Sequence, residues 1–279
     1  MNIWYTLCDA LPFEMLHWDF MKNALLAALL MAPLFGLTST MIVTGRMSFF
    51  SDALGHSAFT GIAIGAICGI ASPTWMAVIF AVAFALLFSF VRSHSNHAAD
   101  TLIGVFSSTA VALGIFVATL DGGSFTKYNK YLIGDILSVT PNEIAILALI
   151  LVAIVVFWIV TSNRLTLCAI HPQLASTRGI SVHLTQAVFT AAIAVVITLA
   201  ISWVGLLILN SLLVLPGAAS RNIARNLRQY HLFSVLIALI ASIAGLCISY
   251  YAGASAGAAI CLVLAFLFLI SFLMRKARA

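Results

Sequence analysis

Charge is scarce in this sequence. Only 8% of its 279 residues are Asp, Glu, Lys or Arg and 63% are hydrophobic, whereas about a quarter of the residues of a soluble domain are charged. Such a chain cannot cover a water-facing surface, which excludes an ordinary soluble domain, and its hydrophobic content excludes disorder. The net charge of +5 comes from scattered Lys and Arg rather than one basic stripe, so nucleic acid is not an expected partner.

Sequence motifs of enzymes are missing as well. There is no His-Glu-x-x-His zinc motif, no Gly-x-Ser-x-Gly elbow and no Walker A loop. The five cysteines are widely spaced and form no Cys-x-x-Cys pair, so they predict neither a disulfide framework nor a thiolate zinc site, and we expect them to be small buried hydrophobes. We therefore expect no enzymatic activity, no permanently bound cofactor and no hydrolysis of ATP by this chain itself.

Long apolar runs are what the sequence has instead. Runs of about 20 residues predict membrane-spanning α-helices, because lipid offers the backbone no other hydrogen-bond partner. We expect an all-α polytopic membrane protein whose residues 1–279 form a single transmembrane domain. About nine spans are predicted, at residues 23–44, 50–71, 73–91, 101–120, 142–161, 184–203, 206–220, 232–251 and 255–274. The run 184–220 needs a break at Trp203, Val204 and Gly205; without that break there are eight spans.

The distribution of basic residues favours nine spans and sets the orientation. Nine spans place ten of the 13 Lys and Arg on one side of the membrane, whereas eight would separate Arg221–Arg228 from Arg164 and Arg178. The side that is richer in Lys and Arg is cytoplasmic. We therefore expect the N-terminus outside and the C-terminus in the cytoplasm.

Two segments are predicted on the outer side. Residues 1–20, with Trp4 and Tyr5 among their aromatics, are expected to form an outer interfacial segment that anchors at the membrane surface or meets a partner. The loop 121–141 is longer than a simple turn, which also suggests a partner.

The longest predicted cytoplasmic loop is the segment 163–183. It contains a short helix-like stretch, 174–178, that Gly179 ends. Such a helix is either a docking surface or part of a plain linker, and composition leaves both interpretations open.

One span carries two ionisable side chains. Of the eight acidic residues only Asp52 falls clearly inside an apolar span, and His56 follows four residues later on the same helix face. An ionisable group in a span costs roughly 2.5–3.5 kcal/mol, so the two side chains either share a divalent cation or form a structural hydrogen bond. Gly61, Gly65 and Gly69 on the same helix predict a close-packing face, which places this helix inside the bundle.

The residues around this pair resemble the second-helix signature of the ABC-3 family, the permease subunits of bacterial zinc, manganese and iron ABC importers. The resemblance covers about residues 20–275. Its stretches are Arg46-Met47, Ser51-Asp52-Ala53-Leu54-Gly55-His56-Ser57-Ala58 and Gly61-Ile62-Ala63-Ile64-Gly65, then Tyr131-Leu132-Ile133-Gly134-Asp135-Ile136-Leu137, His171-Pro172-Gln173-Leu174-Ala175 through Gly179-Ile180, and Val204-Gly205-Leu206-Leu207 through Leu215-Pro216-Gly217-Ala218-Ala219. The family's coupling segment often begins Phe-Asp-Pro-Glu, and here both acids are replaced by His171 and Gln173.

The resemblance implies a type II importer-like permease fold in the cytoplasmic membrane of a bacterium. It implies a homodimer in the lipid bilayer, which works with a separate cytoplasmic ATP-binding-cassette ATPase and an extracytoplasmic solute-binding protein. Asp52 and His56 map onto the path of the transported metal, with Zn²⁺ ranked slightly ahead of Mn²⁺ and Fe²⁺. The coupling residues that contact the ATPase map onto Leu174, Ala175, Arg178 and Gly179.

Two other functions compete with a metal-importer permease. The first is a stand-alone cation carrier or channel, which would move metal without an ATPase. The second is an ABC permease for an organic metal complex, which would tolerate loss of Asp52. His94 and His97 flank a short cytoplasmic loop, where they either touch the metal on its way out or are simply solvated.

Overall fold

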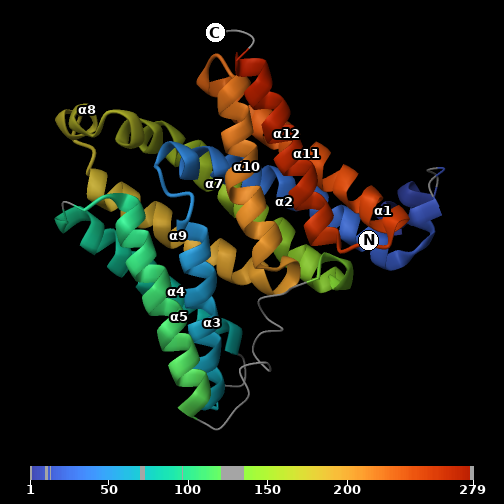
Figure 1. Cartoon of the computed structure of the whole chain (residues 1–279), viewed down its shortest axis with the longest axis horizontal. Helices are drawn as coiled ribbons and strands as arrows, with labels where there is room; N and C mark the ends of the chain where they lie inside the picture. The colour runs from blue at the N-terminus through green and yellow to red at the C-terminus, as the bar shows by residue number, and fades with distance from the viewer. Residues whose placement is uncertain are drawn as a thin grey trace. The chain divides into compact units, whose positions relative to one another are not determined.

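The computed structural model of the chain describes residues 2–9, 12, 14–69, 73–95, 97–120 and 135–276 (Figure 1). Every element in these ranges is helical, which confirms the predicted all-α class. The chain divides into two compact units. The first unit comprises Met1–Thr40, Asp135–Val156 and Trp203–Ala279, and the second comprises Met41–Gly134 and Phe157–Ser202.

Each predicted span corresponds to one long helix in the described residues. These helices are α2 (Asp19–Thr44), α3 (Phe50–Ile67), α4 (Pro73–His94), α5 (Ala99–Leu120), α7 (Pro141–Ile170), α9 (Val182–Val204), α10 (Leu206–Ile223), α11 (Leu227–Ala252) and α12 (Ala256–Lys276). All except α3 are long and apolar enough by themselves to cross a membrane. The exception carries Asp52 and His56, whose polar side chains lower the hydropathy of the helix that holds the candidate site.

The break between α9 and α10 lies where the sequence predicts it. Helix α9 ends at Val204 and α10 begins at Leu206. Gly205 between them has φ 83° and ψ 158°, a backbone conformation essentially restricted to glycine. The alternative of one fused span across residues 184–220 is therefore wrong.

The predicted ends of several spans were wrong by some residues. Helix α7 continues to Ile170, so the predicted loop 163–183 begins eight residues too early. The helix persists because Leu165 and Cys168 are buried and extend its apolar face by another two turns. Its 30 residues measure about 45 Å, well beyond the roughly 30 Å hydrocarbon thickness of a bilayer.

In the first unit, α10, α11 and α12 lie side by side (Figure 1). Small residues let the backbones approach: a Cβ on Gly245 of α11 would lie 2.6 Å from the Cα of Ile260 of α12. Serines add hydrogen bonds, since Ser39 Oγ of α2 accepts one from the backbone N–H of Gly217 of α10 at 2.9 Å. Small residues and short hydroxyl side chains are typical of helix contacts within membranes.

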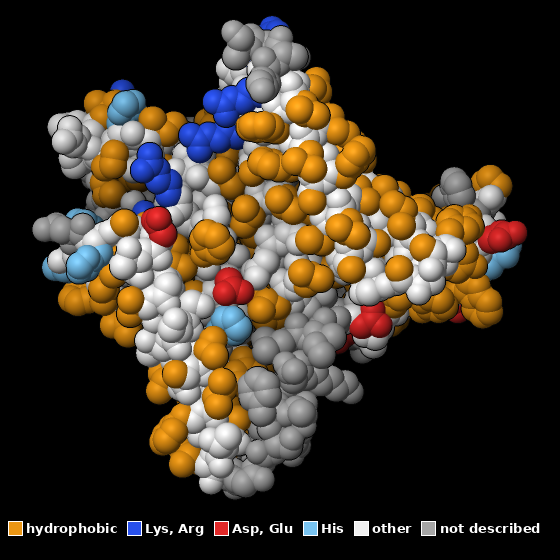
Figure 2. All heavy atoms as spheres, in the orientation of Figure 1, with side chains coloured by type: hydrophobic (Ala, Val, Ile, Leu, Met, Phe, Trp, Pro, Cys, Tyr) orange, Lys and Arg blue, Asp and Glu red, His pale blue; other side chains and the backbone are white. Residues whose placement is uncertain are grey.

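In the second unit, α3 lies between α4 and α5 and contacts both (Figure 1). A buried apolar cluster joins the three helices and consists of Phe59, Ile62, Ala63, Ala77 and Ala118. Hydrophobic side chains also cover much of the molecular face seen in Figure 2, as expected of helices whose outer faces meet lipid.

Candidate functional site

The two site residues predicted from sequence lie together near the start of α3. His56 Nε2 is 3.6 Å from Asp52 Oδ2, and the side chains are 27% and 40% exposed. A hydrogen bond between these atoms would measure about 2.7–3.2 Å, whereas 3.6 Å is within the range of an ion pair. Two ligand atoms bound to one tetrahedral Zn²⁺, each about 2.0–2.2 Å from the ion, are about 3.3 Å apart. The pair is therefore spaced close to the separation that a shared cation requires.

Asp52 lies at the beginning of α3. The residue stands in the first turn of the helix, where the backbone N–H groups and the helix dipole stabilise negative charge. A carboxylate must be ionised to bind a metal. An ionised Asp52 carboxylate at this helix end is suited to binding a cation.

Close contacts with both neighbours fix the helix that carries the pair. A Cβ on Gly61 would lie 2.6 Å from the Cα of Ala77 in α4, so only glycine allows this approach. On the α5 side, Thr60 Oγ1 donates a hydrogen bond to the carbonyl of Ala110 at 2.8 Å. A Cβ on Gly114 would lie 2.7 Å from the Phe59 ring. The sequence predicted Gly61 as a close-packing residue, but it did not predict Thr60 and Gly114. The only sequence signal for these two contacts was a small residue within an apolar helix.

The two other glycines of the predicted close-packing face behave differently. Gly65 is buried. Gly69 has φ 67° and nothing within 4 Å of an added Cβ, so assigning it to the packing face was wrong. It lies just past the end of α3, where a left-handed glycine commonly ends a helix.

Asp52 and His56 provide two protein ligands. In the described part of the chain, no group of three or more His, Cys, Asp or Glu side chains is close enough to hold a metal ion. A metal on this pair would therefore complete its coordination with water or with groups other than those described His, Cys, Asp and Glu side chains. His94 Nδ1 is 2.9 Å from Ser93 Oγ and 3.0 Å from the carbonyl of Phe90, and His97 is exposed.

The short helix predicted in the cytoplasmic segment is α8 (Pro172–Thr177). Gly179 follows it with φ 73°, as a residue that ends a helix. Leu174 is 46% exposed, whereas Ala175 is fully buried. Of the coupling residues that the resemblance implied, Leu174 and Arg178 are exposed to solvent, whereas Ala175 is buried.

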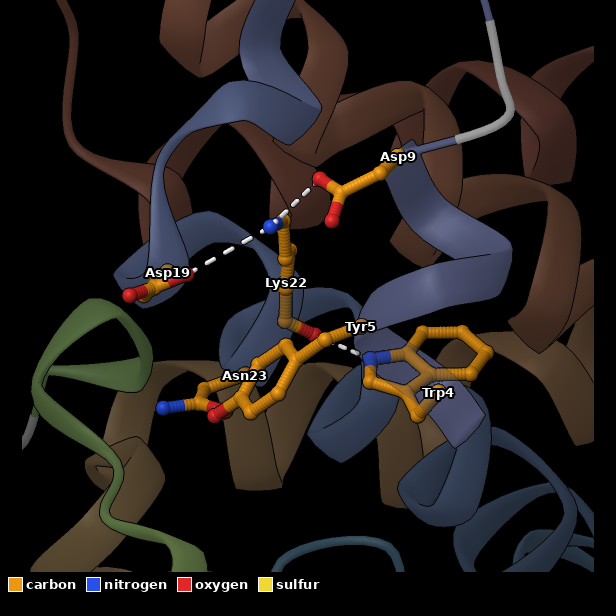
Figure 3. Close-up of polar contacts among 6 residues, drawn as sticks. All are labelled: Trp4, Tyr5, Asp9, Asp19, Lys22 and Asn23. Carbon is orange, nitrogen blue, oxygen red and sulfur yellow. Dashed lines mark hydrogen bonds and ion pairs between the residues drawn. The ribbon is translucent and has the colours of Figure 1, made fainter. Parts of the chain in front are cut away.

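The N-terminal segment packs onto α2 within the first unit (Figure 3). Lys22 of α2 is buried, and its Nζ lies 2.7 Å from Asp9 and 3.4 Å from Asp19. The Trp4 indole N–H donates to the carbonyl of Lys22 at 3.0 Å, and Tyr5 donates from its hydroxyl to Asn23 Oδ1 at 2.8 Å. The helix α1 (Asn2–Asp9) is thus fastened to the protein by the two aromatics that the sequence suggested as membrane or partner anchors.

Two further sequence expectations concern the cysteines and the outer loop. All five cysteines are free, and four are buried or partly buried as expected, but Cys68 is exposed. It lies just beyond the last turn of α3, where nothing covers a side chain. Residues 121–134 of the predicted outer loop, including Tyr128 and Tyr131, lie outside the described residues.

Comparisons with known proteins agree with the fold. The chain is 26% identical over 257 residues to the high-affinity zinc uptake system membrane protein ZnuB of Haemophilus influenzae, with 91% of this chain and 97% of that protein covered. It is 29% identical over 257 residues to the manganese import system permease protein ScaB of Streptococcus gordonii, with coverages of 91% and 90%. Among solved structures, PsaBC from Streptococcus pneumoniae in complex with Fab has a TM-score of 0.79 at 26% identity, with coverages of 98% and 95%.

The family itself follows from the whole length of the chain. The sequence pattern of the ABC 3 transport family matches residues 17–275, which include every long helix and the Asp52–His56 pair. From its helices and this match, the chain is a multi-pass membrane protein that belongs to the ABC 3 transport family.

Proposed function

We propose that this protein is the permease subunit of an ABC importer for a divalent transition-metal ion. The observation that carries the proposal is the Asp52–His56 pair, with its donor atoms 3.6 Å apart on a helix held between two neighbours. ZnuB and ScaB, both similar over about nine-tenths of this chain, are named for zinc uptake and manganese import, which supports metal as the cargo.

The pair suits a transport step better than permanent binding. A structural zinc site has four protein ligands, whereas this pair supplies two and leaves the remaining positions to water. Weaker coordination allows the ion to leave as well as enter. An imidazole suits Zn²⁺ and a carboxylate suits Mn²⁺, so one of each accepts either ion, and the ranking of Zn²⁺ first finds no further support in this chemistry.

The proposed assembly contains two copies of this chain, two copies of a cytoplasmic ATPase and an outer solute-binding protein. The orientation rests on the ten basic residues assigned to one side of the membrane. In that orientation α8 faces the cytoplasm and offers exposed Leu174 and Arg178 to the ATPase. The N-terminal segment and the loop after α5 face outward toward the binding protein.

Substitution of Asp52 tests the proposed metal path. In the complex reconstituted in liposomes with its ATPase and binding protein, Asp52→Asn should lower ATP-driven Zn²⁺ or Mn²⁺ uptake by at least about 10–100-fold, the loss that follows removal of even an outer-shell partner. Asp100→Asn is the matched control, since Asp100 also stands in the first turn of a helix but is exposed.

Equal uptake by the Asp52→Asn variant and the wild type, at equal protein level, would contradict the assignment of Asp52. Uptake by the chain alone, without ATPase or ATP, would instead identify a stand-alone carrier.

A further inference from the structure

A cavity of about 260 Å³ lies within the second unit, beside the start of α8. It is formed where α2 and α4 end and where α7, α8 and α9 meet. Among the described residues, the charged side chains that line it are Arg46 and Arg92, and no acidic side chain does so. A small cavity with two guanidinium groups and no carboxylate is a site for an anion.

Neither arginine has a carboxylate partner in the part of the chain that the structure describes. Arg92 is partly buried, and its Nη2 donates one hydrogen bond, to the carbonyl of Gly45 at 3.2 Å. A guanidinium has five N–H donors, so several remain. No ion pair within 4.0 Å involves Arg46 or Arg92 among the described residues. Arg46 is exposed, whereas Arg92 is partly buried. A partly buried charge is costly without a counter-charge, and an external anion would supply that counter-charge to Arg92.

The end of α2 holds Arg46 in an unusual backbone conformation. The backbone N–H of Met47 donates to the carbonyl of Ile42 at 2.9 Å, and that of Arg46 donates to Val43 at 3.3 Å. These two bonds form the Schellman motif that ends many helices, in which the left-handed position is usually glycine. Here Arg46 takes that position with φ 54°. The fold thus keeps a guanidinium at the cavity where glycine would fit the backbone better.

Apart from Thr44 and Gln186, the rest of the lining is mostly apolar. Met47, Leu165 and Phe189 line the cavity and are nearly completely buried. Inorganic phosphate would bind the arginines but would make no apolar contact with these three side chains. A phosphodiester that carries hydrocarbon would contact both the arginines and the apolar side chains. Arginine binds phosphate oxygens through paired N–H donors, and the glycerol and upper acyl segments can contact the apolar side chains. Basic pockets between membrane helices bind anionic lipid head groups in this way.

We propose that the cavity lined by Arg46 and Arg92 binds the phosphate head group of an anionic phospholipid. The volume accommodates a head group and leaves the acyl chains outside, since pockets that enclose drug-sized ligands begin at about 300 Å³. In the orientation proposed above, the lipid belongs to the cytoplasmic leaflet and lies beside α8. It would stabilise the base of the segment that docks on the ATPase.

Lipid retention by the purified full-length chain tests the proposal. The protein is equilibrated in detergent micelles with equal amounts of phosphatidylglycerol and phosphatidylcholine, and retained lipid is measured by native mass spectrometry. The wild type should retain phosphatidylglycerol preferentially. Arg46→Gly and Arg92→Gln should each lower its retention roughly fivefold, the contribution of one basic residue near an anionic lipid.

Arg164→Gln is the matched control, because Arg164 is an exposed arginine on α7 that does not line the cavity. It should retain as much phosphatidylglycerol as the wild type. Arg46→Gly should fold normally, since glycine is the usual residue at its backbone position, and a normal elution volume on size exclusion would show it.

Equal retention of the two lipids by the wild type would overturn the proposal, as would unchanged retention in both arginine variants. A second arm titrates inorganic phosphate: complete displacement of the lipid at low millimolar phosphate would identify free phosphate as the ligand instead. Loss of the ATPase on co-purification with unchanged lipid retention would assign the arginines to a protein contact. These measurements require neither transport nor a known orientation. A negative result would therefore contradict the lipid site without contradicting the proposed transport function.

Discussion

At the scale of single residues, the backbone conformation of Arg46 favours glycine, yet the sequence has an arginine there. A non-glycine residue in the left-handed conformation costs roughly 1–2 kcal/mol. The positive φ of Arg46 and the two hydrogen bonds that end α2 therefore predict that the native sequence is less stable here than a glycine variant.

Arg46→Gly should raise the free energy of unfolding by about 0.5–1 kcal/mol, because part of the gain is offset by the greater freedom of glycine in the unfolded chain. The thermal midpoint in detergent should rise accordingly. Arg164→Gly, in the interior of α7, should instead lower stability by about 1 kcal/mol. A lower midpoint for Arg46→Gly than for the wild type would show that the side chain, rather than the backbone, dominates at this position.

At the scale of the helix, α3 holds the Asp52–His56 pair only as firmly as its contacts with α4 and α5 allow. Gly61→Ala would place a Cβ 2.6 Å from a backbone atom of Ala77. Because backbone cannot move as a side chain can, this overpacking should cost about 1–3 kcal/mol and lower metal uptake by displacing α3.

Gly104→Ala on α5 provides the control for this helix contact, since nothing lies within 4 Å of its added Cβ. It should be neutral or stabilising by up to about 1 kcal/mol. Thermal unfolding and metal uptake measured on both variants would separate the effect of the α3–α4 contact from the general effect of replacing a helical glycine with alanine. Wild-type stability of Gly61→Ala would contradict the tight α3–α4 approach.

The second element with a predicted role is α8. Leu174 is exposed on it although apolar, and burial of its side chain against the ATPase would make it an interface anchor. Leu174→Asp should lower recovery of the ATPase on co-purification by roughly tenfold or more, because loss of an interface hot spot costs about 2 kcal/mol or more.

Asn163→Asp adds the same charge to an exposed position of α7 outside α8 and should leave ATPase recovery unchanged. If both variants bind the ATPase equally well, the docking surface lies elsewhere on the protein.

At the scale of the whole molecule, the proposed orientation places both Cys8 and Cys68 outside. Cys68 is exposed, whereas Cys8 is buried, and burial raises the pKa of the Cys8 thiol, which lowers the fraction of reactive thiolate at neutral pH. In intact cells, a membrane-impermeant maleimide should therefore label a variant that keeps only Cys68 and fail to label one that keeps only Cys8.

A cysteine-free variant with Ser176→Cys on exposed α8 completes the topology experiment. This thiol should react only after the membrane is permeabilised. Labelling of the α8 cysteine but not of Cys68 in intact cells would reverse the orientation, and with it the sides assigned to the ATPase and the binding protein.

The sequence by itself determined the features that depend on neighbours along the chain. Apolar runs of span length predicted each long helix, because only a helix satisfies its backbone within lipid. Gly205 marked the break between α9 and α10, since few other residues adopt its conformation. The four-residue spacing placed Asp52 and His56 on one face of α3, as the structure confirms.

Tertiary structure alone decided the features that depend on residues far apart in sequence. The ion pair of the buried Lys22 with Asp9, the close approach of Gly61 to Ala77 and the extension of α7 to Ile170 all arise from such contacts. Arg46 and Arg92 meet at one cavity although 45 residues separate them in the sequence. Local pattern carries no information on such meetings, because they are fixed by how whole helices pack, which is why the proposed lipid site became visible only in the folded chain.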